Sequence, residues 1–262
     1  LIVTHHHPDH VGLAGWFQKE YKVSLWMTRT AWLTARMLRL DEQKVPPPET
    51  VEFWTQAGMR SDIMEERKSG KPFNFADAVS ALPLGFRRIV DNEEIEIGNR
   101  IWKVRVGNGH APEHATLWSN VDDIVIAGDQ IISSISPNLG VYATEPNANP
   151  VKEWIDTCHK LSAFASDKHL TLPGHKLPFT GLKFRLKQMV ENHELALNRL
   201  VNFLEKPHTA EECFSILFGK SIQKSEYGLA LVEAVAHVNY LYLEGTVSRV
   251  LDKNGAFRYQ AL

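Results

Sequence analysis

The stretch HHHPDH, residues 5–10, places four histidines and one aspartate within six residues, directly after an apolar run. An affinity tag would explain consecutive histidines, but it would explain neither the aspartate nor the proline-marked turn. Alternate side chains of an extended segment face the same way, so His5 and His7 can converge on one ion. Asp9 and His10 follow the turn and can bind a second ion. Imidazole and carboxylate are the ligands that a divalent metal such as zinc prefers, so the stretch indicates a metal site.

The same residue types recur in three later segments, each at the end of an apolar run. These segments are GNGHAPEH (107–114), IAGDQ (126–130) and LPGHK (172–176). A single His-x-His pair would be weak evidence, because a polar loop would also explain it. Several segments of this kind, all in strand-end loops, together predict a centre that binds metal.

In type and order, these motifs resemble those of the metallo-β-lactamase superfamily. They are His-x-His-x-Asp-His, then Gly-His-x-Pro-x-His, then Gly-Asp, and finally Gly-His. The resemblance implies that one zinc is held by His5, His7 and His110, that a second is held by Asp9, His10 and His175, and that Asp129 bridges both. Such a complete set is typical of the glyoxalase-II-like branch. It implies two Zn²⁺ ions per chain, with iron or manganese as alternative metals.

The chemistry that the resemblance implies is hydrolysis. Two divalent ions about 3.5–4 Å apart bind a water between them and lower its pKa, which supplies hydroxide at neutral pH. Asp9 would accept a proton as the hydroxide attacks, and Asp129 would hold the two ions together. The chain has no Gly-x-Ser-x-Gly nucleophile motif. We therefore expect a metal-dependent hydrolase whose metal-bridging hydroxide attacks a small ester, thioester or lactone.

Two alternatives use the same scaffold. A single-stranded RNA endonuclease or phosphodiesterase would be favoured by a basic groove leading to the metals. From residue 182 onward, ten basic residues stand against nine acidic ones, so nucleic acid is not the favoured partner. An iron-dependent sulfur dioxygenase would use one iron with open positions, and the complete second ligand set counts against it. A small molecule is the expected substrate.

Several residues near the motifs are expected to support the site rather than to bind metal. His6 faces away from its two neighbours by alternation. His114 is expected to orient His110, because metal-bound histidines have supporting partners. The loops after two of the ligands are expected to border the substrate pocket, with simple loop closure as the alternative, and their candidate residues are Ser134, Lys176 and Phe179.

The apolar spacing predicts a helix over 11–21 and a strand at 25–29. Five short apolar runs between residues 86 and 128 are separated by polar turns, which predicts an antiparallel meander. A helix at 150–164 and a strand at 169–175 follow. With the resemblance, this pattern predicts an α/β (α+β) protein with the αββα metallo-β-lactamase sandwich. Members of that superfamily carry several strands before the first motif, so we expect N-terminal strands of the fold to be missing from this sequence.

Two further regions differ from this pattern. Residues 30–75 are charged and helical, which favours an insertion that acts as a lid, packs helix on helix, or forms a homodimer interface. After residue 181 the chain predicts three helices and a hairpin at an Asn-Gly step, a unit that resembles a winged helix. We therefore expect a catalytic domain at 1–181 and a winged-helix-like domain at 182–262.

The composition narrows the class of protein. The chain is 44% hydrophobic and 23% charged with a formal net charge of −2, which argues against a general nucleic-acid-binding surface. No run approaches the roughly 20 apolar residues that a membrane span needs. Cys158 and Cys213 are the only cysteines, too few for a disulfide framework, so we expect a cytoplasmic protein.

Overall fold

A computed structural model describes residues 1–262, the whole sequence. The residues separate into two compact units, which we call the sheet unit and the helical unit. The sheet unit contains Leu1–Glu42, Phe73–Pro137 and Trp154–Gln188, and the helical unit contains Gln43–Pro72, Asn138–Glu153 and Met189–Leu262.

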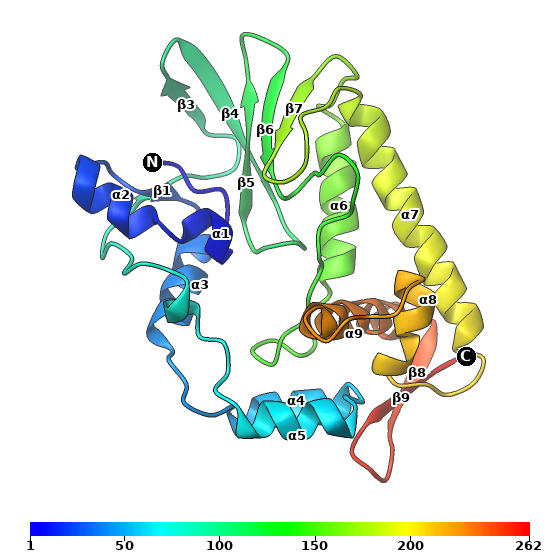
Figure 1. The fold of residues 1–262 in the computed structure, drawn as a ribbon. Helices are drawn as coiled ribbons and strands as arrows, with labels where there is room; N and C mark the ends of the chain where they lie inside the picture. Colours follow the sequence, from blue (N-terminus) through cyan, green and yellow to red (C-terminus); the bar gives the residue numbers. More distant parts are fainter. The chain divides into compact units, whose positions relative to one another are not determined.

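A five-stranded mixed sheet forms the centre of the sheet unit, with the strand order β3-β4-β5-β6-β7 (Figure 1). Its strands are β3 (Glu94–Ile97), β4 (Arg100–Gly107), β5 (His114–Ser119), β6 (Ile124–Gly128) and β7 (Leu170–Pro173). The strands from β3 to β6 are antiparallel neighbours, which confirms a meander over these four strands. β7 runs parallel to β6. Parallel neighbours need a crossover connection, and helix α6 (Pro150–Ser162) is part of it.

Two short strands lie outside this sheet. β1 (Trp26–Met27) and β2 (Arg87–Arg88) form a separate parallel pair. The prediction that residues 86–90 form the first strand of the meander is therefore wrong. The buried residue Ile89 donates its backbone N–H to the carbonyl of Met27 at 2.9 Å, so this run pairs with β1 rather than with β3.

Three helices lie early in the sheet unit: α1 (Pro8–Val11), α2 (Ala14–Tyr21) and α3 (Arg29–Leu40). The helix predicted over 11–21 is interrupted after Val11, where α1 ends and two residues precede α2. Small and apolar side chains from all three helices share one buried cluster, because each helix turns one face inward. The cluster includes Val11, Ala14, Ala31, Ala35 and Phe75.

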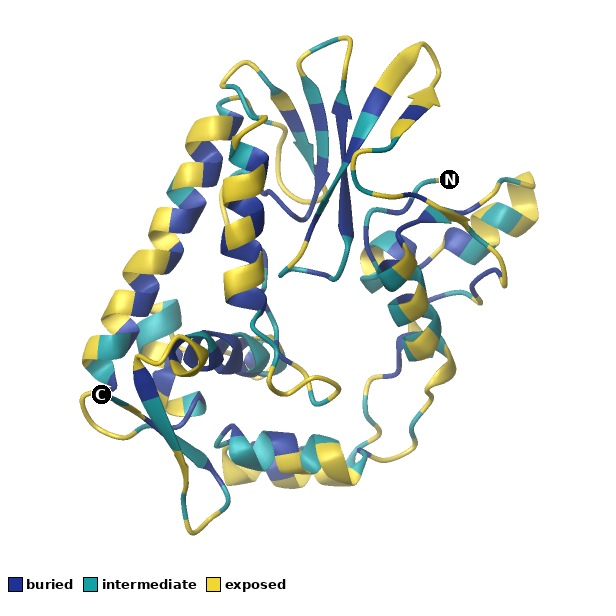
Figure 2. Ribbon diagram, turned by 180° about the vertical axis from the view of Figure 1, so that it is seen from behind, coloured by how far each residue is buried: buried dark blue, intermediate teal, exposed yellow.

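Helices dominate the helical unit. They are α4 (Pro48–Gln56), α5 (Ser61–Ser69), the second half of α7 (Leu182–Phe203), α8 (Phe214–Phe218) and α9 (Tyr227–Leu243). α9 is buried over most of its length, whereas α7 keeps one exposed face (Figure 2). A helix that is apolar on nearly all sides belongs in a core, so α9 is the centre of this unit.

The end of the chain contains the predicted hairpin, and before it a helix that begins at a capping box. Thr209 and Glu212 form a capping box, in which each residue's backbone N–H donates to the other's side-chain oxygen, at 2.8 and 3.3 Å. The capping box begins the 3₁₀ turn Glu211–Cys213, and α8 follows directly. The hairpin consists of β8 (Val247–Leu251) and β9 (Phe257–Ala261) in antiparallel register.

The segment 30–75 is divided between the two units. All of α3 belongs to the sheet unit, whereas α4 and α5 belong to the helical unit. There, the N–H of Glu211 donates to the carbonyl of Ala57 and the N–H of Arg60 donates to the hydroxyl of Tyr227, both at 3.1 Å. The role of the segment as a lid, the domain boundary near residue 181 and the winged-helix assignment stay predictions. No helix of the structure combines the length and the hydropathy that crossing a membrane requires.

Candidate metal centre

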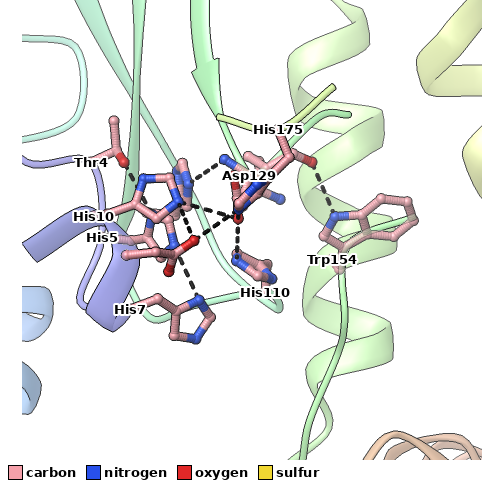
Figure 3. Close-up of polar contacts among 11 residues, drawn as sticks. Thr4, His5, His7, His10, His110, Asp129, Trp154 and His175 are labelled. Atoms are coloured by element: carbon pink, nitrogen blue, oxygen red, sulfur yellow. Dashed lines mark hydrogen bonds and ion pairs between the residues drawn. The ribbon is translucent and has the colours of Figure 1, made fainter. Parts of the chain in front are cut away.

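The predicted ligands meet at one edge of the five-stranded sheet. His110 follows β4, Asp129 follows β6 and His175 follows β7. These three strands end at the same edge, because β4 and β6 both run antiparallel to β5 and β7 runs parallel to β6. The other four ligands come from residues 5–10, just before and within α1. Figure 3 shows the contact of His10 with Asp129 and that of His7 with His5.

Backbone hydrogen bonds hold the N-terminal segment at this edge. The N–H of Ala115, at the start of β5, donates to the carbonyl of Thr4 at 2.8 Å. On the other side, the N–H of Val3 donates to the carbonyl of Trp26 at 3.0 Å. His5 therefore begins the ligand segment next to the point where β5 begins.

The first group of ligands is made of histidines alone. His5, His7 and His110 each offer a ring nitrogen, and these atoms lie within 4.8 Å of one another. Nε2 of His5 is 3.1 Å from Nδ1 of His7, and Thr4 Oγ1 lies 3.0 Å from the other ring nitrogen of His5. Because Thr4 contacts Nδ1 of His5, Nε2 is the ring nitrogen of His5 that faces the other ligands.

The second group contains both carboxylates. It consists of Asp9, His10, Asp129 and His175, again with ligand atoms within 4.8 Å of one another. Oδ2 of Asp129 lies 3.2 Å from Nε2 of His175 and 3.4 Å from Nε2 of His10. The same oxygen lies 3.7 Å from Nε2 of His110, a member of the first group. Asp129 thus faces both groups, as expected for a bridging ligand (Figure 3).

The electrostatics of these side chains fit divalent metal ions. Burial, together with the neighbouring histidines, lowers the pKa of His7 to about 2 and holds the pKa of His5 far below its ordinary value. Both rings are therefore neutral, which is the form that binds metal. Burial opposes ionisation of Asp129, but His10, His110 and His175 outweigh it and keep the pKa of that carboxyl below its ordinary value.

The distances between the ligand atoms also fit bound metal ions. Two atoms bound to one zinc ion at tetrahedral angles lie roughly 3.4 Å apart. The distances from Asp129 Oδ2 to the three histidine nitrogens, 3.2 to 3.7 Å, bracket that spacing and are long for hydrogen bonds. The other oxygen of Asp129, Oδ1, is buried and has no hydrogen-bond partner in the protein. Metal ions would satisfy these atoms, so the donor set fits them.

The glycines of the last two motifs leave no room for a side chain. A Cβ atom on Gly174 would lie 2.2 Å from Asp129 Oδ1 and 2.7 Å from a ring carbon of His10. Gly128 has a left-handed backbone, with φ of +51°, and a Cβ atom there would lie 2.6 Å from the ring of His114. Glycine is therefore required at both positions for the ligands to come together.

Two histidines near the ligands belong to neither group. His6 is half-buried, and burial together with His110 lowers its pKa to about 4. His114 is fully buried, and its contacts differ from those expected of a residue that orients His110. The centroids of the His110 and His114 rings are 6.0 Å apart, whereas Nε2 of His114 accepts a hydrogen bond from the N–H of Asp129 at 3.1 Å.

The residues expected to border the pocket lie on exposed loops. Ser134 is exposed on the loop after Asp129, and Lys176 is exposed with φ of +69°. The backbone of Phe179 pairs with Thr171 through hydrogen bonds of 2.8 and 3.1 Å, so Phe179 closes the loop that carries His175. Contact of these residues with substrate stays a prediction.

Three further residues that support the site were missed by sequence reasoning. Trp154 on α6 donates its indole N–H to the carbonyl of Gln130 at 3.3 Å, next to Asp129 (Figure 3). Arg185 on α7 donates to the carbonyls of Ile132 and Ile135 at 2.8 and 2.9 Å. It thereby holds the loop that follows Asp129. Neither side chain lies within a motif, so their sequence offered no signal.

Glu113 is the third missed residue. Its carboxylate accepts the N–H of Thr30 at 2.6 Å, and its carbonyl accepts the hydroxyl of Thr28 at 2.7 Å. The carboxylate therefore caps the N-terminus of α3, where backbone N–H groups lack partners within the helix. A threonine just before a helical run is a capping signal, but the sequence could not show that its partner lies in the loop that carries His110.

Comparison with known proteins agrees with this geometry. Residues 1–181 match the sequence model of the metallo-beta-lactamase superfamily. The chain belongs to this superfamily. Residues 197–262 match a second model, described as the metallo-beta-lactamase-like C-terminal domain.

Individual relatives cover the whole chain. A beta-lactamase domain protein from Burkholderia ambifaria is 31% identical and superposes with a TM-score of 0.90, over 100% of this chain and 74% of its own. The metallo-beta-lactamase family protein TTHA1429 from Thermus thermophilus has a TM-score of 0.80 at 24% identity, over 100% of this chain and 79% of its own. The "Probable metallo-hydrolase YqjP" of Bacillus subtilis (strain 168) is 24% identical, over 98% of this chain and 79% of its own.

Membership of the superfamily and the set of candidate metal ligands together indicate the class of reaction. Residues 1–181 belong to the metallo-beta-lactamase superfamily, and this chain contains two groups of candidate metal ligands. Together they indicate a metal-dependent hydrolase.

Proposed function

We propose that this protein is a dinuclear zinc-dependent hydrolase of small esters, thioesters or lactones. The observation that supports it most is the position of Asp129, whose Oδ2 lies within 3.7 Å of histidine nitrogens from both ligand groups. A carboxylate shared between two complete groups fits two ions better than one. The first ion would be held by the three histidines, and the second by Asp9, His10 and His175, with Asp129 shared.

The residues of the chain have separate tasks in this proposal. A bound pair of zinc ions would lower the pKa of a water between them and polarise the carbonyl of the substrate. Asp9 is 54% exposed at the side chain, and its Oδ2 lies 2.9 Å from Nε2 of His175, which is 48% exposed. The carboxylate of Asp9 is therefore open to solvent and placed to accept a proton. His5, which is buried, is placed to hold its ion away from solvent.

A nuclease function has less support, because several basic side chains of the C-terminal segment are paired with carboxylates or buried. Arg258 binds Glu212 and Asp252 at 2.8 and 3.0 Å, and Lys220 binds Glu226 at 2.8 Å. Lys224 pairs with Glu66, and Arg185 is buried. Phosphate contacts dominate nucleic-acid affinity, so a groove for RNA would need these charges free. An iron-dependent sulfur dioxygenase has less support because it would leave the second ligand group without a role.

Metal analysis combined with a hydrolysis panel tests the proposal. The protein should bind two zinc ions per chain and hydrolyse at least one of a thioester, an aryl ester and a lactone. It should not act on phosphodiesters or on single-stranded RNA. His110→Ala should lower both metal content and turnover, whereas His159→Ala, which alters an exposed histidine of α6, should change neither. One bound ion, or turnover of RNA alone, would overturn the proposal.

A further inference from the structure

We propose that His114 is a positioning residue that couples the two ligand groups to each other. The inference rests on the proposed dinuclear site and adds a residue that binds no metal itself. His114 is fully buried and touches one ligand from each group. Its ring stacks on His5 of the first group, with centroids 4.5 Å apart and planes inclined by 23°. Its Nε2 accepts the N–H of Asp129, which belongs to the second group, at 3.1 Å.

The hydrogen bond to Asp129 restrains the backbone that carries the shared carboxylate. Asp129 directly follows the last residue of β6, so its N–H lies at the end of the strand and needs another acceptor because it is buried. His114 Nε2 is that acceptor. Holding this N–H restrains the peptide plane that precedes Asp129, and so the backbone from which its carboxylate extends toward His10, His110 and His175.

The stacked contact restrains the other group. The ring of His5 is held at its edge by Thr4 Oγ1, which lies 3.0 Å from Nδ1, and over one face by the ring of His114. Two contacts of this kind define both the rotation and the plane of the His5 ring. The remaining nitrogen, Nε2, then faces Nδ1 of His7 at 3.1 Å.

The surroundings of His114 leave little freedom for this arrangement. A Cβ atom on Gly128 would lie 2.8 Å from His114 Nε2 and 2.6 Å from the adjacent ring carbon. The backbone of the Gly-Asp motif is therefore packed directly on the acceptor edge of the ring. An apolar side chain of similar size would fill this space, but it would leave the N–H of Asp129 buried without a partner. A coupling role and a merely space-filling role thus predict different results.

Three variants separate these roles. His114→Phe keeps a flat ring but has no acceptor, His114→Leu keeps neither ring nor acceptor, and His114→Gln keeps an acceptor near the position of Nε2. Zinc dissociation constants for both ions are measured on the full chain by competition with a chromophoric chelator. The absorption spectrum of the Co²⁺-loaded protein gives a second readout, since it reports ligand geometry. Unfolding of the metal-free variants shows whether each is folded.

We expect the phenylalanine and leucine variants to bind both ions about 10–100-fold more weakly, the usual effect of losing a partner that orients a ligand. The glutamine variant should recover most of the binding of the Asp129 side. Leucine or phenylalanine variants that keep wild-type constants for both ions and an unchanged Co²⁺ spectrum would overturn the coupling role while leaving the dinuclear site intact. A wild-type chain that binds fewer than two ions would instead overturn the proposed function. If the phenylalanine variant does not fold, the leucine and glutamine variants, which both lack the ring, still show the effect of the acceptor alone.

Discussion

Histidines lie close together in both units of this chain, but in opposite surroundings. In the sheet unit, nitrogens of His10, His110 and His175 converge on one carboxylate oxygen of Asp129. In the helical unit, the rings of His193 on α7 and His237 on α9 meet edge to face, 5.5 Å apart. There, Nδ1 of His237 donates to the backbone carbonyl of Glu233 at 2.8 Å.

Comparing these two sets of histidines shows which features distinguish a candidate metal site. Burial lowers the pKa of both His193, to about 4, and His237, so these rings are neutral like those of His5 and His7. Neutral buried imidazole is therefore common to both units. A shared carboxylate and converging nitrogens occur only at the edge of the sheet, and neither His193 nor His237 belongs to a group of candidate ligands.

The largest effect is expected from removing the shared carboxylate. Asp129→Ala should lower kcat/KM by roughly 10²–10³-fold, the range for losing one preorganised electrostatic group. It should also lower the zinc content, because both groups lose a ligand. His237→Ala, the matched change in the helical unit, should leave the zinc content unchanged. Steady-state kinetics and elemental analysis measure both, and an Asp129→Ala protein with two ions and full activity would contradict the comparison.

A smaller effect is expected from adding one methyl group at the centre. Gly174→Ala places a Cβ atom 2.2 Å from Asp129 Oδ1, so the carboxylate must move. Zinc affinity should fall by about 10–100-fold, as for other changes that misplace a ligand. Gly85→Ala is the control, because no atom lies within 4 Å of a Cβ atom there. Equal zinc affinity in the two variants, measured by chelator competition, would show that the Gly174 backbone has room to relax.

In the helical unit, we expect the ionisation of one buried side chain to make the stability of the protein depend on pH. Burial raises the pKa of Glu233 to about 7, although a 2.6 Å hydrogen bond from Asn138 lowers it in part. Between about pH 4.3 and about pH 7, the folded chain therefore holds a proton that the unfolded chain has released. The free energy of unfolding should fall with rising pH over this window, by about 3 kcal/mol from this group.

Glu233→Gln should remove this part of the pH dependence, because the amide does not ionise. Urea unfolding of the metal-free wild type and of the variant, at about pH 5 and about pH 8, gives the difference between the two slopes. The histidines with lowered pKa values contribute equally to both proteins and cancel. The same loss of stability in both proteins would place the titration elsewhere.

The smallest effect is expected from Glu113, whose carboxylate caps helix α3 and belongs to neither ligand group. Glu113→Ala should cost about 1 kcal/mol of stability, because α3 loses the acceptor that caps its first turn. Glu113→Gln keeps an acceptor and should cost less. Both variants should still bind two zinc ions, since Glu113 belongs to neither ligand group. Thermal unfolding and metal analysis check this, and loss of an ion from the alanine variant would give Glu113 a larger role.

Sequence reasoning located the candidate ligands because their signals are local. Alternation brings His5 and His7 together, and the later motifs mark the ends of apolar runs that become β4, β6 and β7. Other features depend on contacts between distant segments. The acceptor of the Asp129 N–H is set only when β5 and β6 pair, so the partner of His114 could not be read from its neighbours.

Charge counting failed for a similar reason. Arg185 was counted among the basic residues of the C-terminal segment, yet its guanidinium is buried and makes no ion pair. Its donors go to two backbone carbonyls and to Gln188, at 2.6 to 2.9 Å. A sum of charges cannot show whether a guanidinium faces solvent or carbonyl oxygens. Both runs of the β1–β2 pair were predicted as strands, but their pairing was not, because an apolar pattern does not show which strand is the neighbour.

Arg185 also has a practical consequence for anyone who wishes to study the hydrolase part alone. The superfamily match ends at residue 181, which makes that residue an inviting place to cut the gene. A fragment ending there would lack the guanidinium that holds Ile132 and Ile135. Those carbonyls follow Asp129 by only a few residues, so the cut would loosen the loop beside the shared carboxylate. A minimal fragment should therefore extend through Gln188, where the sheet unit itself ends.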